Sequence, residues 1–498
     1  MTTTENLSKK AQNFISSPRK MLINGQWVGS ASGKNFDTLN PATGKVIVSV
    51  AEGDKEDIDR AVRAARAAFD DGPWSSLNPT ARERCLHKLA DLMEENADIL
   101  SELEALDNGK NVAIARAVDI QLAIDFIRYM AGWPTKIKGG MLPLSVPYAP
   151  EAKFLGYTLK EPVGVVGQII PWNFPALMCA WKLGPALAAG CTVVLKPAEE
   201  TPLTALYLGE LICQAGFPDG VVNIIPGYGH TAGAALTTHE QVDKIAFTGS
   251  TEVGKIIVKA AADTMKNVSM ELGGKSPAII LPDADLEIAI PGAASAIFFN
   301  QGQVCCAGSR LFVPDSLYDQ VVEGLADVAS GMKIGPGLNP ENMVNPLVSQ
   351  IQFDRVMGYI ESGRAEGADI VAGGERSGDE GYFVQPTILG NTNRDMTVVR
   401  EEIFGPVVCV QRYNNIDEIA NLANDTVYGL GASIWTRDVG NVINIVPKIR
   451  AGSVWVNCHN ILDVAMPFGG YKQSGFGKDM GEESLASYLE TKSVCIMA

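Results

Sequence analysis

The sequence predicts an α/β protein with a doubly wound parallel sheet, a second α/β region and a small β element. Three observations support this prediction. Short apolar strands alternate with helices between Val163 and Ile280, and a second series of strands follows Gly274. The segment Gly139–Glu161 instead carries prolines and two short runs of alternating polarity. Buried strands that alternate with helices are typical of parallel sheets with helices on both faces.

The first region contains the most regular alternation. Two helices are expected before it, at 56–69 and from Thr80, where Thr80 and Glu83 fit a capping box. A nucleotide site at the carboxyl ends of the strands is the default for such a sheet. We expect strands at 163–170, 192–195, 221–225, 244–247 and 268–270, and helices at 176–188, 203–215, from 232 and at 252–265.

The rest of the chain supplies the second sheet and the β element. Alternating runs at 142–146 and 154–160 predict a β-hairpin, and 483–494 could add one more helix and strand. Because a lone hairpin is marginally stable in water, we expect it to pair with another subunit. Strands of the second region are expected at 278–281, 311–313, 407–413, 432–436 and 453–457.

Length and composition indicate a soluble enzyme of two or three domains. The 498 residues are 46% hydrophobic and carry a formal charge of −16, which disfavours nucleic acid and anionic lipid as partners. No run of about 18 apolar residues predicts a membrane span. The N-terminus lacks the features of a secretory signal, so we expect a cytoplasmic protein.

Cysteine and histidine usage argues against disulfides and metals. The nine cysteines include no C-x-x-C pair, and only Cys305 and Cys306 lie close together in the sequence. Four histidines are scattered without metal-ligand spacing, so no metal site is expected.

The run Phe298–Arg310, FFNQGQVCCAGSR, is the most informative stretch for chemistry. Cys305 lies among small residues that leave room for a substrate and free backbone N–H groups for a developing oxyanion. Most cysteines, however, are small buried hydrophobes, and this segment alone does not separate the two interpretations.

Two further segments follow predicted strands of the first sheet. Glu271 in MELGGK is either a solvated residue at a strand end or a base whose pKa is tuned by partial burial. Asn173 in IPWNFP could donate its amide to an oxyanion, or could be a turn residue before a helix that begins with proline.

Two loops are candidates for a nucleotide. The loop Phe247–Gly254, FTGSTEVG, ends a strand and opens a helix, which suits a pyrophosphate although it is not G-x-G-x-x-G. The glycines Gly227, Gly229 and Gly233 have one residue too many for that motif. Lys196 and Glu199 could hold ribose hydroxyls, or could form a surface ion pair of little consequence.

Together these segments resemble the aldehyde dehydrogenase superfamily, in the right order and over essentially the whole chain. MELGGK and FFNQGQVC carry the resemblance most specifically, and PWNFP, KPAEETP, FTGSTEVG, EEIFGPV and PFGGYKQSG add to it. Within the superfamily the sequence looks most similar to bacterial phenylacetaldehyde dehydrogenases.

The resemblance implies a role for each matching position. Cys305 is expected to be the nucleophile, Glu271 the general base, and Asn173 the side-chain half of an oxyanion hole completed by the backbone N–H of Cys305. NAD is the expected cofactor, because the carboxylate of Glu199 would repel a 2′-phosphate. The positions expected to contact it are Ile169, Pro171, Trp172, Lys196, Glu199, Gly229, Gly233, Phe247, Gly249, Ser250, Val253, Leu272, Gln352, Glu402 and Phe404.

The same resemblance implies a substrate tunnel and three structural parts. An apolar, partly aromatic lining suits a hydrophobic aldehyde such as phenylacetaldehyde, while broad aliphatic aldehydes and, through Asp463 near the mouth, betaine aldehyde are alternatives. The implied parts are an NAD-binding domain (1–138 and 162–273), a catalytic domain (274–473) and an oligomerisation element (139–161 and 474–498) that builds dimers or tetramers. The tunnel positions are Phe174, Leu177, Met178, Trp181, Val304, Leu462 and Phe468.

Two rivals belong to other classes. A cysteine hydrolase would need a histidine beside Cys305, and none occurs in the surrounding segments. A catalytically silent binding or structural protein would not need Cys305, Glu271 and Asn173 together.

Overall fold

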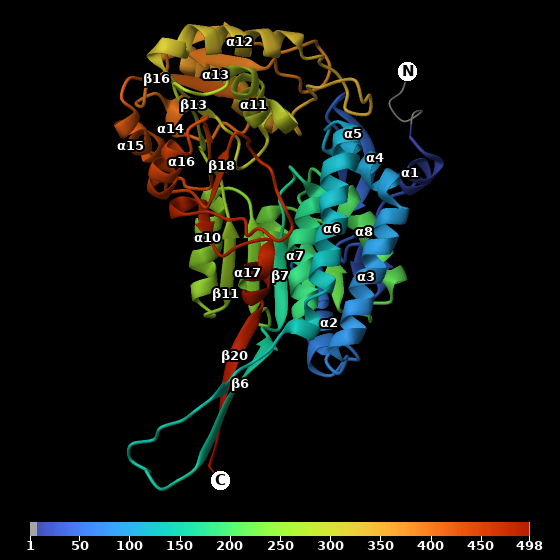
Figure 1. The fold of residues 1–498 in the computed structure, drawn as a ribbon. Coiled ribbons are helices and arrows are strands. Elements are labelled where there is room, and N and C mark those ends of the chain that lie inside the picture. Colours follow the sequence, from blue (N-terminus) through green and yellow to red (C-terminus); the bar gives the residue numbers. More distant parts are fainter. Residues whose placement is uncertain (1–6, 498) are drawn as a thin grey trace.

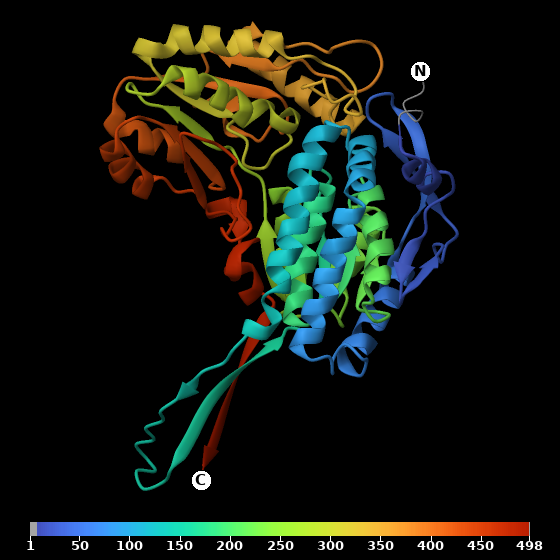
Figure 2. The ribbon, with the colours of Figure 1, turned by 45° about the vertical axis from the view of Figure 1, so that its right-hand side comes forward.

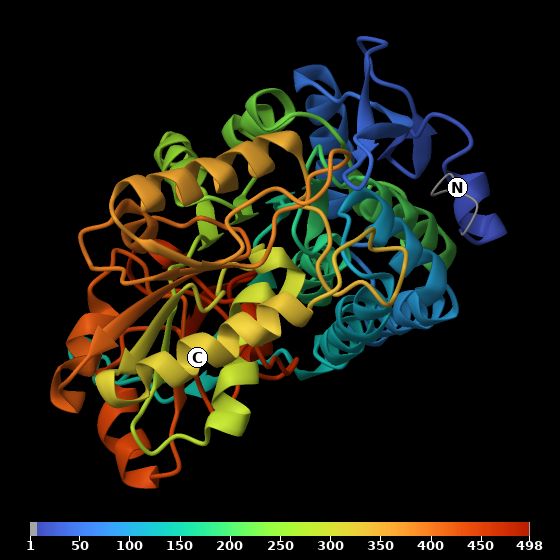
Figure 3. The same cartoon turned by 90° about the horizontal axis from the view of Figure 1, so that it is seen from above.

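A computed structural model describes residues 7–497 as two α/β bodies with a projecting β arm. Figure 1 shows the second body above the first and the arm extending below. Figure 3 shows from above how the yellow-to-orange residues of the second body lie beside the blue and cyan elements of the first. The predicted fold class is confirmed.

The first sheet has eight strands in the order β19-β11-β10-β7-β8-β9-β1-β2. Its five central strands are parallel, and the chain runs outward from β7 in one direction and then in the other, as a doubly wound sheet requires. The strands are β1 (Met21–Ile23), β2 (Gln26–Val28), β7 (Val165–Ile169), β8 (Thr192–Lys196), β9 (Val222–Ile224), β10 (Lys244–Thr248), β11 (Asn267–Glu271) and β19 (Gly475–Phe476).

Helices cover both faces of this sheet because its buried strands point apolar side chains both ways. On β7, Val165 and Val166 belong to different hydrophobic cores, and on β8 Val193 and Val194 do the same. One face carries α3 (Pro79–Glu95), α6 (Gln121–Ala131), α7 (Pro175–Ala189) and α8 (Leu203–Ala215); the other carries α2 (Lys55–Asp70), α9 (Ala234–Thr238) and α10 (Thr251–Ala262).

The start of α3 corrects one expectation. The helix begins at Pro79 rather than with a capping box at Thr80, and the side chain of Asn78 accepts a hydrogen bond from Ala81 N. Proline at the first helical position needs no hydrogen-bond partner for its nitrogen, so Asn78 and Pro79 together form the better start.

The second sheet has seven strands in the order β14-β15-β16-β13-β12-β17-β18, parallel except for β14. Its strands are β12 (Pro277–Ile280), β13 (Arg310–Pro314), β14 (Asp369–Ala372), β15 (Thr387–Gly390), β16 (Val407–Tyr413), β17 (Gly431–Trp435) and β18 (Ser453–Val456). Its main helices are α11 (Leu286–Phe298), α12 (Tyr318–Gly331), α13 (Gln350–Ala365), α15 (Ile419–Asn424) and α16 (Val439–Ile445). The five strands expected in this region are present, and β14 and β15 are additional.

The arm pairs two segments that are far apart in the sequence. Strand β6 (Phe154–Pro162) pairs antiparallel with β20 (Leu489–Met497) over nine residue pairs and with the short β5 (Met141–Leu142). Figure 2 shows this arm clear of the body. Residues 475–476 form β19 at the edge of the first sheet, so within 474–498 only β20 joins the arm.

The remaining elements are short helices and one hairpin that pack against these two bodies. They include α1 (Lys9–Phe14), the hairpin of β3 (Asn35–Asn40) and β4 (Lys45–Ala51), α4 (Ala97–Asp107), α5 (Val112–Ile114), the π-helical turn η1 (Ala115–Ile120), α14 (Thr397–Arg400) and α17 (Gly481–Ala486). Within residues 7–497, no helix combines the length and the apolar character needed to cross a membrane.

Candidate active site

Three of the predicted segments leave the first sheet at the same edge. β7 and β10 are parallel neighbours, and between them the strand order reverses. The turn that holds Asn173 follows β7, the loop Gly249–Ser250 follows β10, and Glu271 is the last residue of β11. The reversal of strand order thus creates the crevice expected for a ligand.

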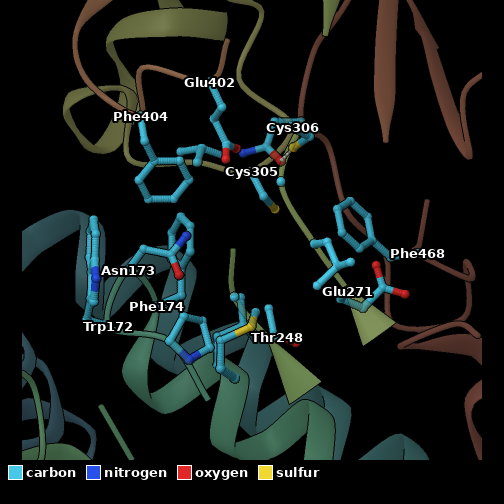
Figure 4. A pocket seen from close by; sticks show the side chains of 18 of the residues that line it. Trp172, Asn173, Phe174, Thr248, Glu271, Cys305, Cys306, Glu402, Phe404 and Phe468 are labelled. Atoms are coloured by element: carbon cyan, nitrogen blue, oxygen red, sulfur yellow. Dashed lines mark hydrogen bonds between the residues drawn. The ribbon is translucent and has the colours of Figure 1, made fainter. Parts of the chain in front are cut away.

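A cavity of about 570 Å³ lies at this edge, between the two bodies. Cys305, Glu271 and Asn173 all line it, and Figure 4 shows Cys305 between Glu271 and Phe468 on one side and Asn173 and Phe404 on the other. The other predicted residues in its wall are Pro171, Trp172, Phe174, Leu177, Met178, Trp181, Gly249, Ser250, Leu272, Val304, Gln352, Glu402, Phe404, Leu462 and Phe468.

Two glycines let the loop of Cys305 pack against neighbouring backbone. A Cβ on Gly274 would lie 2.3 Å from the carbonyl oxygen of Cys305, and one on Gly302 would lie 2.0 Å from that of Gly405. Gly302 also has φ +69°, which favours glycine. The MELGGK and EEIFGPV segments therefore hold the loop of Cys305 from two sides.

The thiol of Cys305 is partly exposed to the cavity. A hydrogen bond with Cys306 and burial together raise its pKa well above the ordinary value. Cys306 in turn donates its thiol to Asn460 Oδ1 at 3.1 Å. A thiol in this setting needs a base or a bound ligand before it becomes a nucleophile.

Glu271 is a buried carboxyl group without a hydrogen-bond partner. Its side chain is 5% exposed, and neither carboxylate oxygen is bonded within the described chain. Burial and repulsion from Asp479 raise its pKa well above the ordinary value, against the attraction of Lys182 and Lys478. Figure 4 shows the carboxylate on the side of Phe468, pointing away from Cys305. An unbonded carboxyl of raised pKa suits a general base.

The amide of Asn173 is fixed from behind. Its Nδ2 donates one proton to the carbonyl of Gln303 at 3.0 Å, and the side chain lines the cavity. Because an amide nitrogen carries two protons, the second is free to bond an oxygen in the cavity.

The loop after β10 has the features of a phosphate site. Ser250 caps α10 by accepting from Val253 N at 3.2 Å, and the helix N-terminus that follows attracts anions. A Cβ on Gly249 would lie 2.4 Å from the ring of Phe247, so only glycine lets the loop backbone pass this close to the ring. The hydroxyl of Thr248 is buried, has no hydrogen-bond partner among residues 7–497, and also lines the cavity.

The opposite wall comes from the EEIFGPV segment. The ring of Phe404 meets Trp172 edge-on at 5.2 Å between centroids. Glu402 accepts a hydrogen bond from Gly274 N at 2.9 Å, and burial raises its pKa to about 7. Gln352 directs its amide to the carbonyl of Phe404 at 2.8 Å, so it supports this loop.

A second cluster lies outside the cavity, beyond the end of β8. Lys196 Nζ donates to Glu199 Oε2 at 3.1 Å and to the carbonyl of Gly227 at 2.7 Å. Gly229 N points to Glu199, at 3.4 Å, and Gly233 packs against the Lys196 side chain. Burial opposes the charge of Glu199, but attraction to Lys196 and hydrogen bonds outweigh it, and its pKa is lowered.

Besides the four predicted positions of this second cluster, three further predicted cofactor positions do not line the cavity. Ile169 and Phe247 are buried in the core beneath it, and Val253 lies exposed in the first turn of α10.

The end of the cavity where the predicted substrate positions lie is aromatic. Trp181 and Phe468 lie 5.4 Å apart between ring centroids, and Phe174 stacks on Phe299 at 6.3 Å. Phe299 was not predicted, although it belongs to the FFNQGQVCC segment. Ser295 and Asn460 bring polar groups to the same lining.

The structure also corrects the argument about histidine. His459, more than 150 residues from Cys305 in the sequence, lines the cavity. Its Nε2 bonds the carbonyl of Cys306 at 2.8 Å and its Nδ1 bonds Ser433 Oγ at 2.8 Å, so both ring nitrogens are engaged away from the thiol of Cys305. Burial lowers its pKa to about 4. His459 therefore supports the loop of Cys305 and is poorly suited to activate the thiol.

Comparisons with known proteins agree with this geometry. Residues 27–494 match the model of the aldehyde dehydrogenase family. The chain belongs to the aldehyde dehydrogenase family. Among its relatives, DhaS of Bacillus subtilis (strain 168) is 53% identical over 99% of this chain and 98% of its own length. The human mitochondrial aldehyde dehydrogenase is 49% identical over 96% and 92%.

Solved aldehyde dehydrogenases share the complete fold. An NAD⁺ complex of the Bacillus cereus aldehyde dehydrogenase superposes with a TM-score of 0.96 at 50% identity, covering 99% of both chains. A betaine aldehyde dehydrogenase from Staphylococcus aureus, also with NAD⁺, gives 0.95 at 39% identity, covering 98% of this chain and 96% of that one. The expectation of an oxidoreductase that acts on aldehydes is confirmed.

Proposed function

We propose that this aldehyde dehydrogenase uses NAD to oxidise a hydrophobic aldehyde, such as phenylacetaldehyde, to its carboxylic acid. The observation that supports this best is that one cavity combines a thiol, a buried carboxyl group without a partner, and an amide with a free proton. These are the groups of Cys305, Glu271 and Asn173.

The residues present fit an NAD molecule. The N-terminus of α10 and the open approach at Gly249 suit a pyrophosphate, and the Lys196–Glu199 pair suits ribose hydroxyls. Thr248, Glu402 and Phe404 would border the nicotinamide end. When bound, NAD supplies the two-electron acceptor for the oxidation.

In the proposed reaction the Cys305 thiol loses its proton to solvent, and the thiolate adds to the aldehyde carbon. The oxyanion that forms accepts hydrogen bonds from Asn173 Nδ2 and the backbone N–H of Cys305. Oxidation of this adduct leaves an acyl group on Cys305 as a thioester. Glu271 takes a proton from water, and the resulting hydroxide adds to the acyl carbon. The C–S bond then breaks, the acid leaves, and the sulfur takes the proton from Glu271 and becomes a thiol again.

The aromatic lining supports an aryl or other apolar substrate. Trp181, Phe468 and Phe174 place ring faces and edges at the substrate end of the cavity. The same rings would also attract a quaternary ammonium group. The aromatic lining therefore keeps betaine aldehyde as the alternative substrate. Asp463 does not favour it, because its carboxylate caps Ala465 N and lies outside the cavity wall.

One assay tests the proposal. Purified enzyme is given NAD or NADP with phenylacetaldehyde, benzaldehyde, hexanal and betaine aldehyde, and nicotinamide reduction is followed by absorbance. We expect the highest kcat/KM with NAD and phenylacetaldehyde. A preference for betaine aldehyde or hexanal would overturn the substrate class, and a preference for NADP would overturn the cofactor.

We also propose that the arm joins copies of this chain in dimers or tetramers. Met141, Leu142, Leu155 and Ile496 are exposed on it, which is unusual for a strand ribbon in water. Light scattering of the enzyme and of a Leu142→Lys/Ile496→Lys variant tests this; a monomeric wild type would refute it. A cytoplasmic location stays a prediction.

A further inference from the structure

The turn that carries Asn173 is held by a segment some 60 residues earlier in the chain. Asn108 Nδ2 donates to the carbonyl of Trp172 at 2.7 Å, and Lys110 Nζ donates to that of Asn173 at 2.8 Å. Glu104 Oε2 accepts from Ala176 N at 2.9 Å, in the first turn of α7, a helix that lacks a side-chain cap of its own. Backbone groups on both sides of the Asn173 side chain are thus bonded to residues 104–110.

Lys110 is the centre of this arrangement. It forms ion pairs with Asp119 and, at 3.4 Å, with Glu104, and its side chain is 3% exposed while both carboxylates are fully buried. Its ammonium group also lies 4.1 Å from the centroid of the Phe174 ring. Burial raises the pKa of Glu104 to about 8 against the attraction of Lys110.

The other side of the turn is held by the loop of Cys305. Asn300 Nδ2 donates to the same carbonyl of Asn173 at 3.1 Å, and Asn173 Nδ2 donates to the carbonyl of Gln303. The Asn173 carbonyl therefore has two donors, one from each side. With the backbone and one amide proton fixed, the direction of the second amide proton is fixed as well.

A buried ion cluster contributes little net stability, because desolvation offsets the attraction between its charges. An oxyanion donor, in contrast, must be held within about half an ångström of its working position. The cluster also borders the cavity, since Asp119 and its neighbours Val118 and Leu122 line the wall. Asp119 lies in the π-helical turn η1, a distortion that is frequent at functional sites.

We propose that Lys110 is a positioning residue for aldehyde oxidation, which holds the Asn173 carbonyl so that the Asn173 amide points at the developing oxyanion. This inference rests on the proposed function. Lys110 itself touches neither the aldehyde carbon nor the thiol; it acts through Asn173.

A double-mutant cycle tests the inference. kcat/KM is measured for the wild type, Lys110→Met, Asn173→Ala and the double variant, with active sites counted by labelling of Cys305. We expect Lys110→Met to lower kcat/KM about 10- to 100-fold in the wild type, and no more than about 3-fold when Asn173 is already alanine. A role of Lys110 in folding alone would lower the number of active sites and leave kcat/KM per active site unchanged.

Controls separate the outcomes. Lys266→Met removes another buried lysine that donates to two backbone carbonyls, at the opposite end of β11 from Glu271, and should change kcat/KM less than about 2-fold. If Lys110→Met is insoluble, kcat/KM is compared instead between Asp119→Asn and the double variant Lys110→Met/Asp119→Asn. The double variant removes one positive and one negative charge and keeps similar side-chain volumes.

An equal loss in both backgrounds, or no loss in a folded Lys110→Met enzyme, would overturn the role of Lys110. Full activity of Asn173→Ala would instead overturn the proposed oxyanion role of Asn173, so the two failures can be told apart. A primary deuterium isotope effect that rises in Lys110→Met but not in Lys266→Met would further support the inference.

Discussion

Replacing Glu271 by glutamine should separate the two halves of the reaction. The substitution is nearly isosteric, and it breaks no hydrogen bond because neither carboxylate oxygen has a partner in the described chain. In the proposed reaction, acylation of Cys305 does not require Glu271, whereas hydrolysis of the thioester does. The variant should therefore form the thioester and then stall.

The expected magnitude follows from the loss of a general base. Such a group contributes about 10²- to 10⁴-fold, so steady-state kcat should fall by that factor, equivalent to about 3 to 5 kcal/mol of activation free energy. One equivalent of NADH per active site should still appear in a rapid burst, which stopped-flow absorbance measures. Unchanged steady-state turnover would refute the base assignment.

The same variant has a predicted effect on stability. Glu271 has a pKa raised by burial, so the folded state holds its proton more tightly than the unfolded chain. Wild-type stability from this group is present below the unfolded pKa and falls as pH rises toward the folded value. The glutamine variant should therefore be at least as stable as the wild type, with the larger advantage at alkaline pH, as thermal unfolding at pH about 6 and about 9 would show.

Glu402→Gln is the matched control, because it makes the same change to another glutamate of the cavity wall, one that is half-buried. The Glu402→Gln variant should lower the rate of the NADH burst, and the rate of the later steady phase should fall by no more than the burst rate does. A slow burst in Glu271→Gln would instead place that residue in the first half-reaction.

Three other perturbations give distinct outcomes. Because the hydrogen bond with Cys306 and burial raise the pKa of Cys305, kcat/KM should rise with pH from about 6 to about 9, and because burial raises the pKa of Glu271, kcat should rise over the same range; a flat profile of either would contradict the role of the corresponding residue. Gly302→Ala places a Cβ 2.0 Å from the Gly405 carbonyl at positive φ and should cost at least about 2 kcal/mol of unfolding free energy, which denaturant titration measures; a shift below 0.5 kcal/mol would show that the loops are free to separate. Phe468→Ala should lower kcat/KM about 10-fold for phenylacetaldehyde and less than 3-fold for acetaldehyde, since only the larger substrate loses about 1.4 kcal/mol of contact; equal losses would move Phe468 out of the substrate site.

Much of the first body could be predicted because its strands and helices are encoded locally. Apolar runs bounded by turn residues gave β7, β8, β10 and β11 within one or two residues. Since parallel strands end at one edge, the alternation placed Asn173, Gly249 and Glu271 at the same edge of the sheet, whereas their roles came from the family resemblance.

What could not be predicted depends on contacts between distant segments. His459, Lys110 and Asp119 reach the site through the order of strands and the packing of helices, and no local pattern marks them. The lack of a partner for Glu271 is a property of the packed cavity and leaves no trace in MELGGK. The edge strand β14 and its neighbour β15 have only four residues each, so their apolar signal is weak.

The pairing of β6 with β20 has a consequence for biosynthesis. Lys160 and its partner Thr491 are 331 residues apart, and at about 5 to 20 residues per second the ribosome needs roughly a quarter of a minute to a minute to cover that gap. During this interval one side of β6 has no partner and exposes unsatisfied peptide groups to other nascent chains. Slower elongation or early termination should therefore increase aggregation, and an affinity tag is better placed at the N-terminus than directly after β20.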